Sequence, residues 1–308
     1  MKRVLIADRT HEVLVDRLRE AGFDVRVEPD HDYHSLIAAV QGCDGLVVRS
    51  KVIIDRAFID AGPSLRCIGR VGAGMETIDT DYAESRGIRC LNSPEGNRDA
   101  VGEHTVGLLL ALLNNIARAD AEVRQGLWRR EANRGFELGN LTVGIIGFGN
   151  MGQAFAKRLS GFGCRIVYYD IKDLEGLNDL KASALSLEEL QRCADVVSFH
   201  VPLTAVTRHY LDTAFIDAMQ KPFFLLNTSR GAVVDTEALV AGLASGKVRG
   251  AALDVLEDEN MQADTLSTFN FQLSTFNCVF TPHVAGWTAE SKYKLASVLA
   301  DKIIDTLQ

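Results

Sequence analysis

The stretch that decides the fold reads Gly147-Phe148-Gly149-Asn150-Met151-Gly152. The apolar run 142–146 before it has the composition of a β-strand, and residues 153–162 after it have the periodicity of a helix. In such a unit the first glycine permits a tight turn, the second lets the backbone approach a pyrophosphate, and the third lets helix and strand pack closely. The positive end of the helix faces the phosphates. We therefore predict a dinucleotide site; the alternative is a glycine-rich turn that binds no ligand.

A second predicted strand, residues 165–169, ends in Asp170. A carboxylate at this place accepts hydrogen bonds from both hydroxyls of an adenosine ribose and repels a 2'-phosphate. The position of Asp170 therefore favours NAD over NADP as the cofactor. Lys172 lies close enough in the sequence to weaken that preference.

Strand-like and helical patterns alternate along almost the whole chain, which predicts an α/β protein with parallel sheets covered by helices on both faces. Two such series follow each other, so we expect two doubly wound domains with a cleft between them. The predicted strands are 4–7, 25–27, 45–48, 67–70 and 89–91 in the first series, and 142–146, 165–169, 196–199, 223–226, 250–253 and 279–280 in the second.

Two long helical patterns lie outside this alternation. One follows Asn97, which offers a side-chain cap, and continues to Gly126, which predicts a single helix of about 28 residues, roughly 40 Å long. Such a helix bridges two domains or lies across a partner subunit. The other, residues 288–307, lets the chain return to the first domain. Residues 262–277 lack periodicity and are predicted to form a surface loop beside the site.

Composition and charge narrow the class of protein. The 308 residues, 47% hydrophobic and only 7% aromatic, suit two domains with aliphatic cores. A net charge of -8 argues against a nucleic-acid or anionic-membrane surface. The N-terminus lacks a signal-peptide pattern, and the apolar run 106–113 is far shorter than a membrane span. The six cysteines form no CxxC or metal-ligand pattern, so we expect reduced thiols, no metal and a cytoplasmic location.

Three polar segments follow predicted strands of the second series, where open α/β sheets bind their ligands. They contain Arg230, Glu259 and His283. Interconversion of a 2-oxo acid and a 2-hydroxy acid needs a fixed cation, a proton donor, and an acid that orients the donor. Arg230, His283 and Glu259 fit these three tasks in that order. Taken singly, the histidine also fits a loop position, the arginine a cap or ion pair, and the glutamate a solvated acidic run.

Together these motifs resemble the D-isomer-specific 2-hydroxyacid dehydrogenase family over nearly the whole chain. The matching segments are the glycine turn and residues 227–231, 252–255 and 281–283. The resemblance implies a flavodoxin-like substrate-binding domain (1–94 and 285–308) and a Rossmann NAD domain (95–284). It also implies a catalytic triad of Arg230, Glu259 and His283.

The resemblance further implies that Asp254 holds the nicotinamide carboxamide and that residues 200–204 line the cofactor site. The predicted cofactor residues are Gly147, Phe148, Gly149, Asn150, Met151, Gly152, Asp170, His200, Val201, Pro202, Thr204, Thr228, Asp254 and Gly286. The family usually has proline after the catalytic glutamate, whereas this chain has Asn260. Glu257 is therefore kept as the alternative to Glu259.

A glycine-rich segment of the first domain, residues 69–74, follows a predicted strand, and its backbone N–H groups suit a carboxylate. Arg49, Lys51 and Arg70 would form a cationic rim for the substrate; the alternative is that Arg49 and Arg70 only pair with surface carboxylates. The predicted substrate residues are Arg49, Arg70, Val71, Gly72 and Ala73.

Within the family, residues 48–50, 69–74, 92–97 and 126–128 are most similar to the D-3-phosphoglycerate dehydrogenases. That similarity implies interconversion of 3-phosphoglycerate and 3-phosphohydroxypyruvate in serine biosynthesis, without the regulatory C-terminal domain of many such enzymes. It also implies a homodimer with Trp128 at the interface, unless this tryptophan is buried within one subunit. A glyoxylate or hydroxypyruvate reductase is the main alternative. A non-catalytic, NAD-sensing corepressor-like protein is the alternative of another class.

Overall fold

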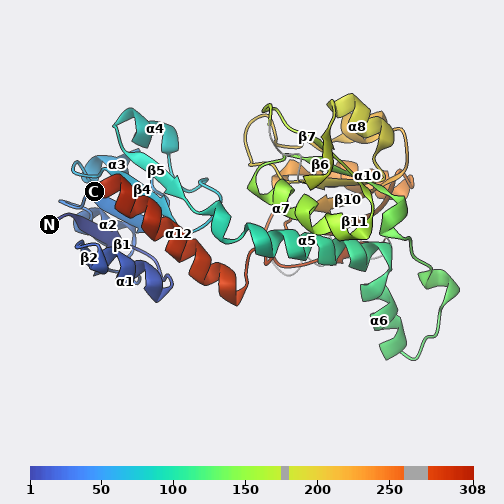
Figure 1. Cartoon of the computed structure of the whole chain (residues 1–308), viewed down its shortest axis with the longest axis horizontal. Coiled ribbons are helices and arrows are strands. Elements are labelled where there is room, and N and C mark those ends of the chain that lie inside the picture. Colours follow the sequence, from blue (N-terminus) through green and yellow to red (C-terminus); the bar gives the residue numbers. More distant parts are fainter. Residues whose placement is uncertain (175–179, 260–276) are drawn as a thin grey trace. The chain divides into compact units, whose positions relative to one another are not determined.

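A computed structural model of the protein describes residues 1–174, 180–259 and 277–308. The chain divides into two compact units (Figure 1). The first unit contains Met1–Asp99 and Trp287–Gln308, and the second contains Ala100–Gly286. The sequence placed these boundaries after residues 94 and 284. Most of the predicted loop 262–277 lies outside the described residues.

The first unit is built on a five-stranded parallel sheet in the order β2-β1-β3-β4-β5, the flavodoxin-like order that the family resemblance implied. Its strands are β1 (Arg3–Ile6), β2 (Asp24–Val27), β3 (Gly45–Val48), β4 (Cys67–Arg70) and β5 (Arg89–Asn92). Its helices are α1 (Glu12–Glu20), α2 (Tyr33–Ala39), α3 (Arg56–Ala61), α4 (Thr80–Ser85), the 3-10 turn η1 (Pro94–Gly96) and α12 (Ala289–Leu307).

Alternation of side chains along the strands explains why helices cover both faces of this sheet. Along β3, Leu46 and Val48 pack against α2, α3 and α4, whereas Val47 packs against α1 and α12. The C-terminal helix α12 therefore completes the fold of the N-terminal segment, as predicted. Thr288 caps it by accepting a hydrogen bond from the backbone N–H of Ser291.

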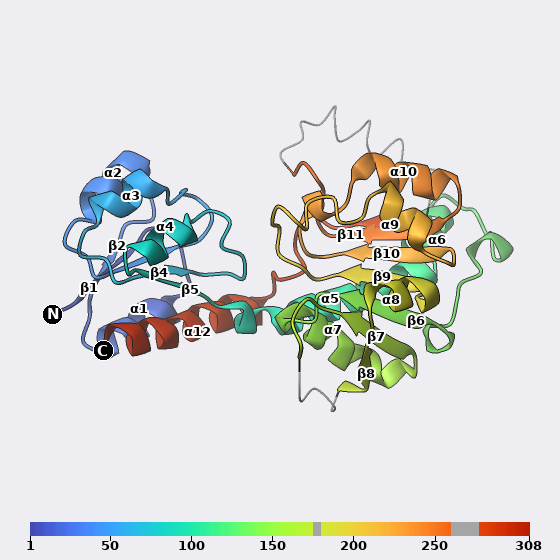
Figure 2. The ribbon, with the colours of Figure 1, turned by 90° about the horizontal axis from the view of Figure 1, so that it is seen from above.

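The second unit is built on a seven-stranded parallel sheet in the order β12-β11-β10-β9-β6-β7-β8 (Figure 2), which is the Rossmann order with one added strand. Its strands are β6 (Thr142–Ile146), β7 (Arg165–Tyr169), β8 (Ala182–Ala184), β9 (Val196–Phe199), β10 (Phe223–Asn227), β11 (Val248–Leu253) and β12 (Cys278–Phe280). The short edge strand β8 was not predicted, because three residues with two alanines carry little β-propensity.

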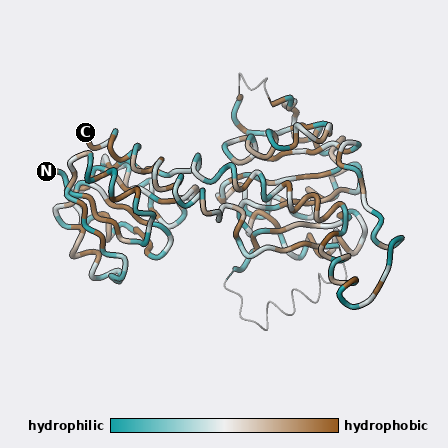
Figure 3. The backbone as a smooth tube through the Cα atoms, turned by 60° about the horizontal axis from the view of Figure 1, so that its bottom comes forward, coloured by the Kyte–Doolittle hydropathy of each residue, from teal (hydrophilic) through white to brown (hydrophobic). Residues whose placement is uncertain are grey.

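The same alternation builds the core of the second unit. Along β10, Phe223 and Leu225 face α8, α9 and α10, whereas Phe224 and Leu226 face α5 and α7. Figure 3 shows this pattern as hydrophobic strands inside each unit and hydrophilic connections around them. The helices are α5 (Arg98–Leu113), α6 (Ile116–Arg124), α7 (Asn150–Leu159), α8 (Leu187–Cys193), α9 (Thr213–Ala218) and α10 (Thr236–Ala244), with 3-10 turns η2 (Glu131–Asn133), η3 (Leu138–Asn140), η4 (Ser160–Phe162) and η6 (Gly231–Val233).

The prediction of one long helix between Asn97 and Gly126 is wrong. The chain forms α5 and α6, which meet at a bend of 60°. Asn115 adopts a left-handed conformation (φ 53°), which asparagine tolerates better than most residues, and this breaks the helical hydrogen-bond ladder. Asn97 is not the expected cap either, because its buried Oδ1 accepts no hydrogen bond in the described part of the chain. Gly126 ends α6 with a φ of 77°, as predicted.

Among the described residues, no single helix is both long and apolar enough to cross a membrane, and α5 and α6 meet that condition only as a bent pair. Helix α5 is largely a core helix of the second unit, with Leu109 and Leu112 fully buried. The six cysteines are free thiols. Cys43 and Cys67 are buried and the other four are partly buried, and burial raises the pKa of Cys67 to about 12.

Candidate active site

The glycine turn after β6 has the backbone that a dinucleotide requires. Gly147 has a φ of 87°, and a Cβ there would lie 2.5 Å from the carbonyl oxygen of His200. A Cβ at Gly152 would lie 2.2 Å from the carbonyl oxygen of Gly147. Both positions therefore admit only glycine. A Cβ at Gly149 would meet nothing within 4 Å, so this side of the turn is open.

Helix α7 begins in this turn, and no side chain caps its N-terminus. Its first N–H groups are thus available to an anion. Asp170, at the end of β7, accepts hydrogen bonds from the backbone N–H groups of Phe148 (2.6 Å) and Lys172 (2.9 Å). The Phe148 ring itself is buried and stacks on Tyr168, 3.9 Å between centroids, so only its backbone belongs to the turn. The residues present fit an NAD-type dinucleotide.

The segment after β9 forms one wall of this turn. His200 and Val201 lie against Gly147. The His200 imidazole contacts Phe155, lies 2.8 Å from Ser198 Oγ through Nε2, and has a buried Nδ1 without a partner in the described residues. Burial lowers its pKa from 6.5 to about 3. His200 is therefore neutral at neutral pH, which suits a wall residue and not a proton donor.

Pro202 and Thr204 continue this wall in a loop that is stabilised by hydrogen bonds within the loop. Thr207 Oγ1 donates to the carbonyl oxygen of Pro202 at 2.6 Å and accepts a bond from the backbone N–H of Thr204 at 2.7 Å. Of the other predicted cofactor residues, Asn150 is exposed and Met151 partly exposed at the start of α7, and Thr228 lies at the end of β10. Thr228 Oγ1 is 3.2 Å from Thr105 Oγ1 of α5.

The three predicted catalytic residues follow three neighbouring parallel strands. Arg230 follows β10, Glu259 follows β11 and His283 follows β12. Since the carboxyl ends of parallel strands share one edge of the sheet, all three residues lie at that edge. Asn227, which ends β10, is fully buried and shapes the loop of Arg230: its Nδ2 donates to the Arg230 carbonyl oxygen at 2.9 Å. Its Oδ1 accepts the backbone N–H of Ser229 at 3.0 Å.

The structure brings His283 and Glu259 together. His283 Nδ1 lies 2.8 Å from Glu259 Oε2, and their side chains are 49% and 42% exposed. An ionised carboxylate only accepts hydrogen bonds, so Nδ1 carries the proton and Nε2 is left for another partner. Glu257, the alternative to Glu259, lies elsewhere, with Oε1 2.5 Å from Nε2 of His209. This geometry favours the pairing of His283 with Glu259.

Asp254 is 1% exposed and organises the segment of His283. Its Oδ1 accepts hydrogen bonds from Thr281 Oγ (2.6 Å) and the backbone N–H of Val284 (2.9 Å), and its Oδ2 accepts one from the backbone N–H of Ala285 (2.9 Å). His104 of α5 lies 3.0 Å from Thr281 Oγ1 and extends this network. The sequence suggested only a contact with nicotinamide for Asp254; its structural task was missed.

In the first unit, Arg49 lies where the strand order of the sheet reverses. Asp8 follows β1 and Arg49 follows β3, and these strands are neighbours at the reversal, where such sheets bind ligands. Asp8 Oδ2 accepts the backbone N–H of Arg49 at 2.8 Å. The Arg49 guanidinium lies over the ring of Trp287, 4.9 Å from its centroid. Asp8 and Trp287 could not be found from the sequence, because neither belongs to a recognisable motif.

In the glycine-rich segment after β4, residues 72–74, called the nest below, present backbone N–H groups that are open to an anion. Its carbonyl groups are occupied: those of Gly72, Ala73 and Gly74 accept bonds from Ser93 N, Asn92 Nδ2 and Arg70 Nη1. The N–H groups of residues 72–74 donate to no acceptor in the described ranges. Arg70 also donates from Nε to the carbonyl oxygen of Arg49 at 2.9 Å. Arg70 thus holds the nest in shape, and residues 72–74 offer the donors.

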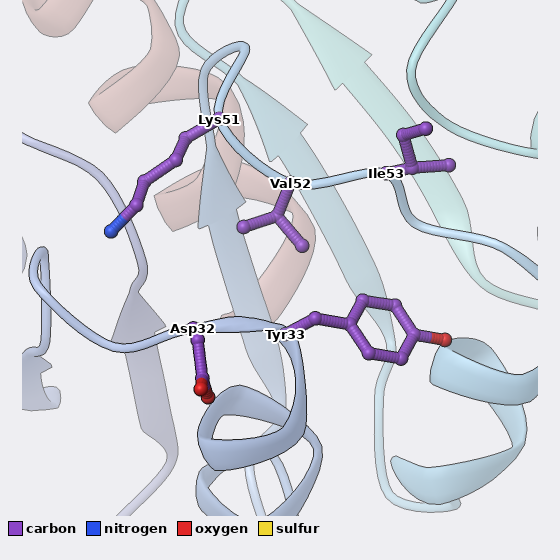
Figure 4. A pocket seen from close by; sticks show the side chains of 5 residues that line it. All are labelled: Asp32, Tyr33, Lys51, Val52 and Ile53. Atoms are coloured by element: carbon purple, nitrogen blue, oxygen red, sulfur yellow. The ribbon is translucent and has the colours of Figure 1, made fainter.

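A hollow of about 390 Å³ in the first unit is lined by Asp32, Tyr33, Lys51, Val52 and Ile53 (Figure 4). Its polar groups are already engaged. Lys51 Nζ donates to the carbonyl oxygens of Pro29 (2.8 Å) and His31 (3.0 Å), and Tyr33 donates to Asp55. Two backbone carbonyl groups therefore hold the Lys51 ammonium, which the sequence placed in a cationic rim with Arg49 and Arg70. The described residues contain no cluster of three or more metal-ligating side chains.

The chain is similar to known proteins over nearly all of its length. Residues 106–285 match the model of the NAD-binding domain of D-isomer-specific 2-hydroxyacid dehydrogenases. The chain is 38% identical to the hydroxypyruvate reductase of Thermotoga maritima over 285 residues, 92% of each chain. It is 34% identical to the D-3-phosphoglycerate dehydrogenase of Methanocaldococcus jannaschii, covering all of this chain but 58% of that protein. The D-lactate dehydrogenase of Aquifex aeolicus, solved with NAD and lactic acid, superposes with a TM-score of 0.80 at 26% identity, covering 99% of this chain and 94% of that one.

Proposed function

The chain belongs to the D-isomer-specific 2-hydroxyacid dehydrogenase family, and on that premise we propose that it is NAD-dependent and interconverts 3-phosphoglycerate and 3-phosphohydroxypyruvate. The family assignment makes it an oxidoreductase of small 2-hydroxy and 2-oxo acids. The cofactor preference, the particular acid and the residue roles are the proposal.

The observation that carries the proposal is the pair of His283 and Glu259 at the carboxyl edge of the second sheet. With Nδ1 bound to Glu259, Nε2 of His283 is placed to give a proton to the oxygen of a 2-oxo acid, or to take one from a 2-hydroxy acid. Glu259 stabilises the ring in its protonated form. Arg230 binds the carboxylate and polarises the carbonyl. When bound, nicotinamide supplies or accepts the hydride.

For the substrate, two features of the first unit together support an acid with two anionic groups, such as a phosphorylated acid. The nest of residues 72–74 offers backbone N–H donors for a carboxylate. The Arg49 guanidinium is held over Trp287 and is partly exposed, so it can meet a second anionic group. Glyoxylate and hydroxypyruvate lack that second group. The relative from Thermotoga, which the chain matches over 92% of its length, is named for hydroxypyruvate, so this acid is the main competitor.

For the cofactor, Asp170 supports NAD. Its carboxylate lies at the end of β7 beside the open turn, where a 2'-phosphate would meet a negative charge. The first experiment is therefore a panel of phosphohydroxypyruvate, hydroxypyruvate and glyoxylate, each assayed with NADH and with NADPH. Highest efficiency with NADH and phosphohydroxypyruvate supports the proposal. Greater efficiency with glyoxylate or hydroxypyruvate would replace the substrate, and turnover with none would refute the function.

The roles of the triad need a separate test. His283→Gln should reduce turnover by about 10³-fold or more while leaving NADH binding intact, since the proton donor is lost and the cofactor turn is untouched. Glu259→Gln should cause a smaller loss. Substantial residual turnover in His283→Gln would show that another group donates the proton.

We also propose a homodimer that uses the segment from α6 to η2. Helix α6 has no buried residue and points away from the sheet of the second unit (Figure 1). Trp128, which follows it, is 78% exposed, so it is not a tryptophan buried within one subunit. Light scattering should give twice the mass of one chain, and Trp128→Ser should lower it at micromolar concentration. Val206→Ser, at an equally exposed apolar side chain, is the control.

A further inference from the structure

His209 connects the segments that carry Arg230 and Glu259. Its backbone N–H donates to the carbonyl oxygen of Ala232, two residues after Arg230, at 2.7 Å. Its ring Nε2 lies 2.5 Å from Oε1 of Glu257, two residues before Glu259. His209, which precedes Arg230 by 21 residues, is thus hydrogen-bonded to both segments.

The backbone conformation of His209 is unfavourable and is held in place by the residues around it. Its φ of 52° lies in the left-handed region, which costs a residue with a side chain about 1 kcal/mol or more unless the surroundings fix it. Here the surroundings do so: Leu211 N donates to the Val233 carbonyl oxygen (3.0 Å), and Asp235 N donates to the Leu211 carbonyl oxygen (2.9 Å). The loop of His209 is therefore fastened alongside η6, directly after Arg230.

Glu257 is held as firmly on the other side. Its Oε2 accepts bonds from Thr236 Oγ1 (2.7 Å) and Thr236 N (3.3 Å) at the start of α10. Burial opposes its ionisation, but these bonds and the one from His209 prevail and lower the pKa of Glu257. A second carboxylate, Asp235, faces the other ring nitrogen of His209 at 3.8 Å. The ring thus lies between two acidic groups: Asp235, which stands between η6 and α10, and Glu257 in the loop of Glu259.

Backbone packing couples the same two segments. A Cβ on Gly231 would lie 1.7 Å from the carbonyl oxygen of Leu256 and 2.5 Å from Glu257 N. The chain next to Arg230 therefore touches the chain that leads to Glu259, without any side chain between them. A shift of residues 256–257 would therefore also displace the backbone next to Arg230.

We propose that His209 and Glu257 are positioning residues, which fix the loop of Glu259 so that its carboxylate stays within hydrogen-bond reach of His283. The inference rests on the proposed function, because it concerns the orientation of the proposed proton donor His283. It assigns no chemistry to His209 or Glu257 themselves. Loss of the pair should leave cofactor and substrate binding intact and slow the step that needs His283 to be oriented.

The test uses two variants that keep the local fold. His209→Asn retains a residue that tolerates the left-handed conformation but is too short to reach Glu257, and Glu257→Gln retains an acceptor for Thr236. Each should lower kcat about 10-fold with KM for NADH within about twofold, and the double variant should be no slower than either single one. His31→Asn, which breaks the comparable His31–Glu28 pair (3.4 Å) of the first unit, should leave kcat unchanged. Wild-type kcat in either variant, or additive losses in the double variant, would overturn the proposal.

A second readout does not depend on turnover. In protein labelled with ¹⁵N-histidine at a pH where imidazoles are neutral, the Nδ1–H tautomer of His283 reports its bond to Glu259, and the His283→Gln variant assigns the signal. His209→Asn and Glu257→Gln should shift His283 towards a mixture of tautomers, and an unchanged tautomer would refute the positioning role. Should wild-type protein reduce none of the three acids, the proposed function fails, and this measurement alone decides the coupling.

Discussion

The backbone N–H of His283 donates to the carbonyl oxygen of Asp254 at 2.7 Å. The carboxylate of the same aspartate accepts the next two backbone N–H groups, and His283 adopts a left-handed conformation with a φ of 54°. A buried acid therefore shapes the turn that presents the proposed proton donor. Because the strain at His283 persists only while these bonds hold it, the orientation of its ring depends on Asp254.

Asp254→Asn should damage both stability and turnover. The amide that replaces one carboxylate oxygen is a donor, and its least costly orientation points it at the N–H of Ala285, where an acceptor is needed. An unsatisfied buried donor costs about 1–3 kcal/mol in the free energy of unfolding. We expect a loss of that size in urea unfolding and a fall in kcat of about 10-fold or more, because the His283 turn loosens. Asp217→Asn, on an exposed position of α9, is the control. Unfolding and kcat like those of the wild type would show that the carboxylate is not needed for the turn.

Asp170→Asn should shift the cofactor preference towards NADPH. The variant keeps an acceptor oxygen for the N–H of Phe148 but removes the charge that opposes a 2'-phosphate. The ratio of kcat/KM with NADH to that with NADPH should fall about 10-fold or more, mainly through a lower KM for NADPH. Asp173→Asn removes a neighbouring exposed charge and should leave the ratio unchanged. An unaltered ratio in Asp170→Asn would mean that another group selects the cofactor.

Arg49 and Arg70 should behave differently when replaced. Arg70 clamps the carbonyl oxygens of Arg49 and Gly74, so Arg70→Gln should distort the nest and lower kcat/KM for every acid. Arg49 is fixed through its backbone by Asp8, so Arg49→Gln leaves the loop in place and removes only the cation over Trp287. We expect Arg49→Gln to reduce kcat/KM about 10-fold for phosphohydroxypyruvate and little for glyoxylate.

The two-substrate comparison decides this point, with Arg66→Gln at the exposed position just before β4 as the control for a lost surface charge. Equal losses on both acids in Arg49→Gln would argue against contact between Arg49 and a phosphate. Selective loss in Arg70→Gln instead would assign the phosphate to Arg70, and its clamp on the backbone would then be secondary.

The fold was largely predictable from the sequence because its strands are short apolar runs that are bounded by turn-forming residues. Residues 142–146 and 165–169 were placed without error, and the sheet orders followed from the family resemblance. The bend at Asn115 was missed because apolar residues on both sides continue a helical pattern, and only a left-handed residue interrupts it. Such a break depends on one backbone conformation, which hydrophobic periodicity does not reveal.

The candidate site was predictable where residues follow strands and not where they meet across loops. The positions of Arg230, Glu259 and His283 follow from the sheet, since each comes just after a parallel strand, although their catalytic roles stay predictions. His209 and Glu257 are 48 residues apart, and nothing in either segment indicates that they touch. The carbonyl partners of Lys51 were missed for the same reason, because they come from the loop before α2 and not from the segment of Lys51 itself.

Finally, His200 should make the protein less stable as the pH falls. Its pKa is lowered by burial to about 3 in the folded protein and is about 6.5 in the unfolded chain. Between these values the unfolded state binds a proton that the folded state does not. The contribution of the neutral His200 ring to the free energy of unfolding is therefore at its full size above pH 6.5 and declines towards pH 3. The loss should amount to about 2 kcal/mol between pH 8 and pH 5.

The variant His200→Gln isolates this contribution, because glutamine does not titrate but can still bond to Ser198 Oγ. Urea unfolding at pH 8 and pH 5 should show the stability advantage of the wild type over the variant shrinking by about 2 kcal/mol at the lower pH. His34→Gln, at an exposed histidine, should show the same difference from wild type at both pH values. An advantage of the wild type that stays constant or grows at pH 5 would mean that the His200 ring takes up its proton without unfolding. His200 would then be accessible enough to act as an acid beside the cofactor turn, and the choice of His283 as sole proton donor would have to be reconsidered.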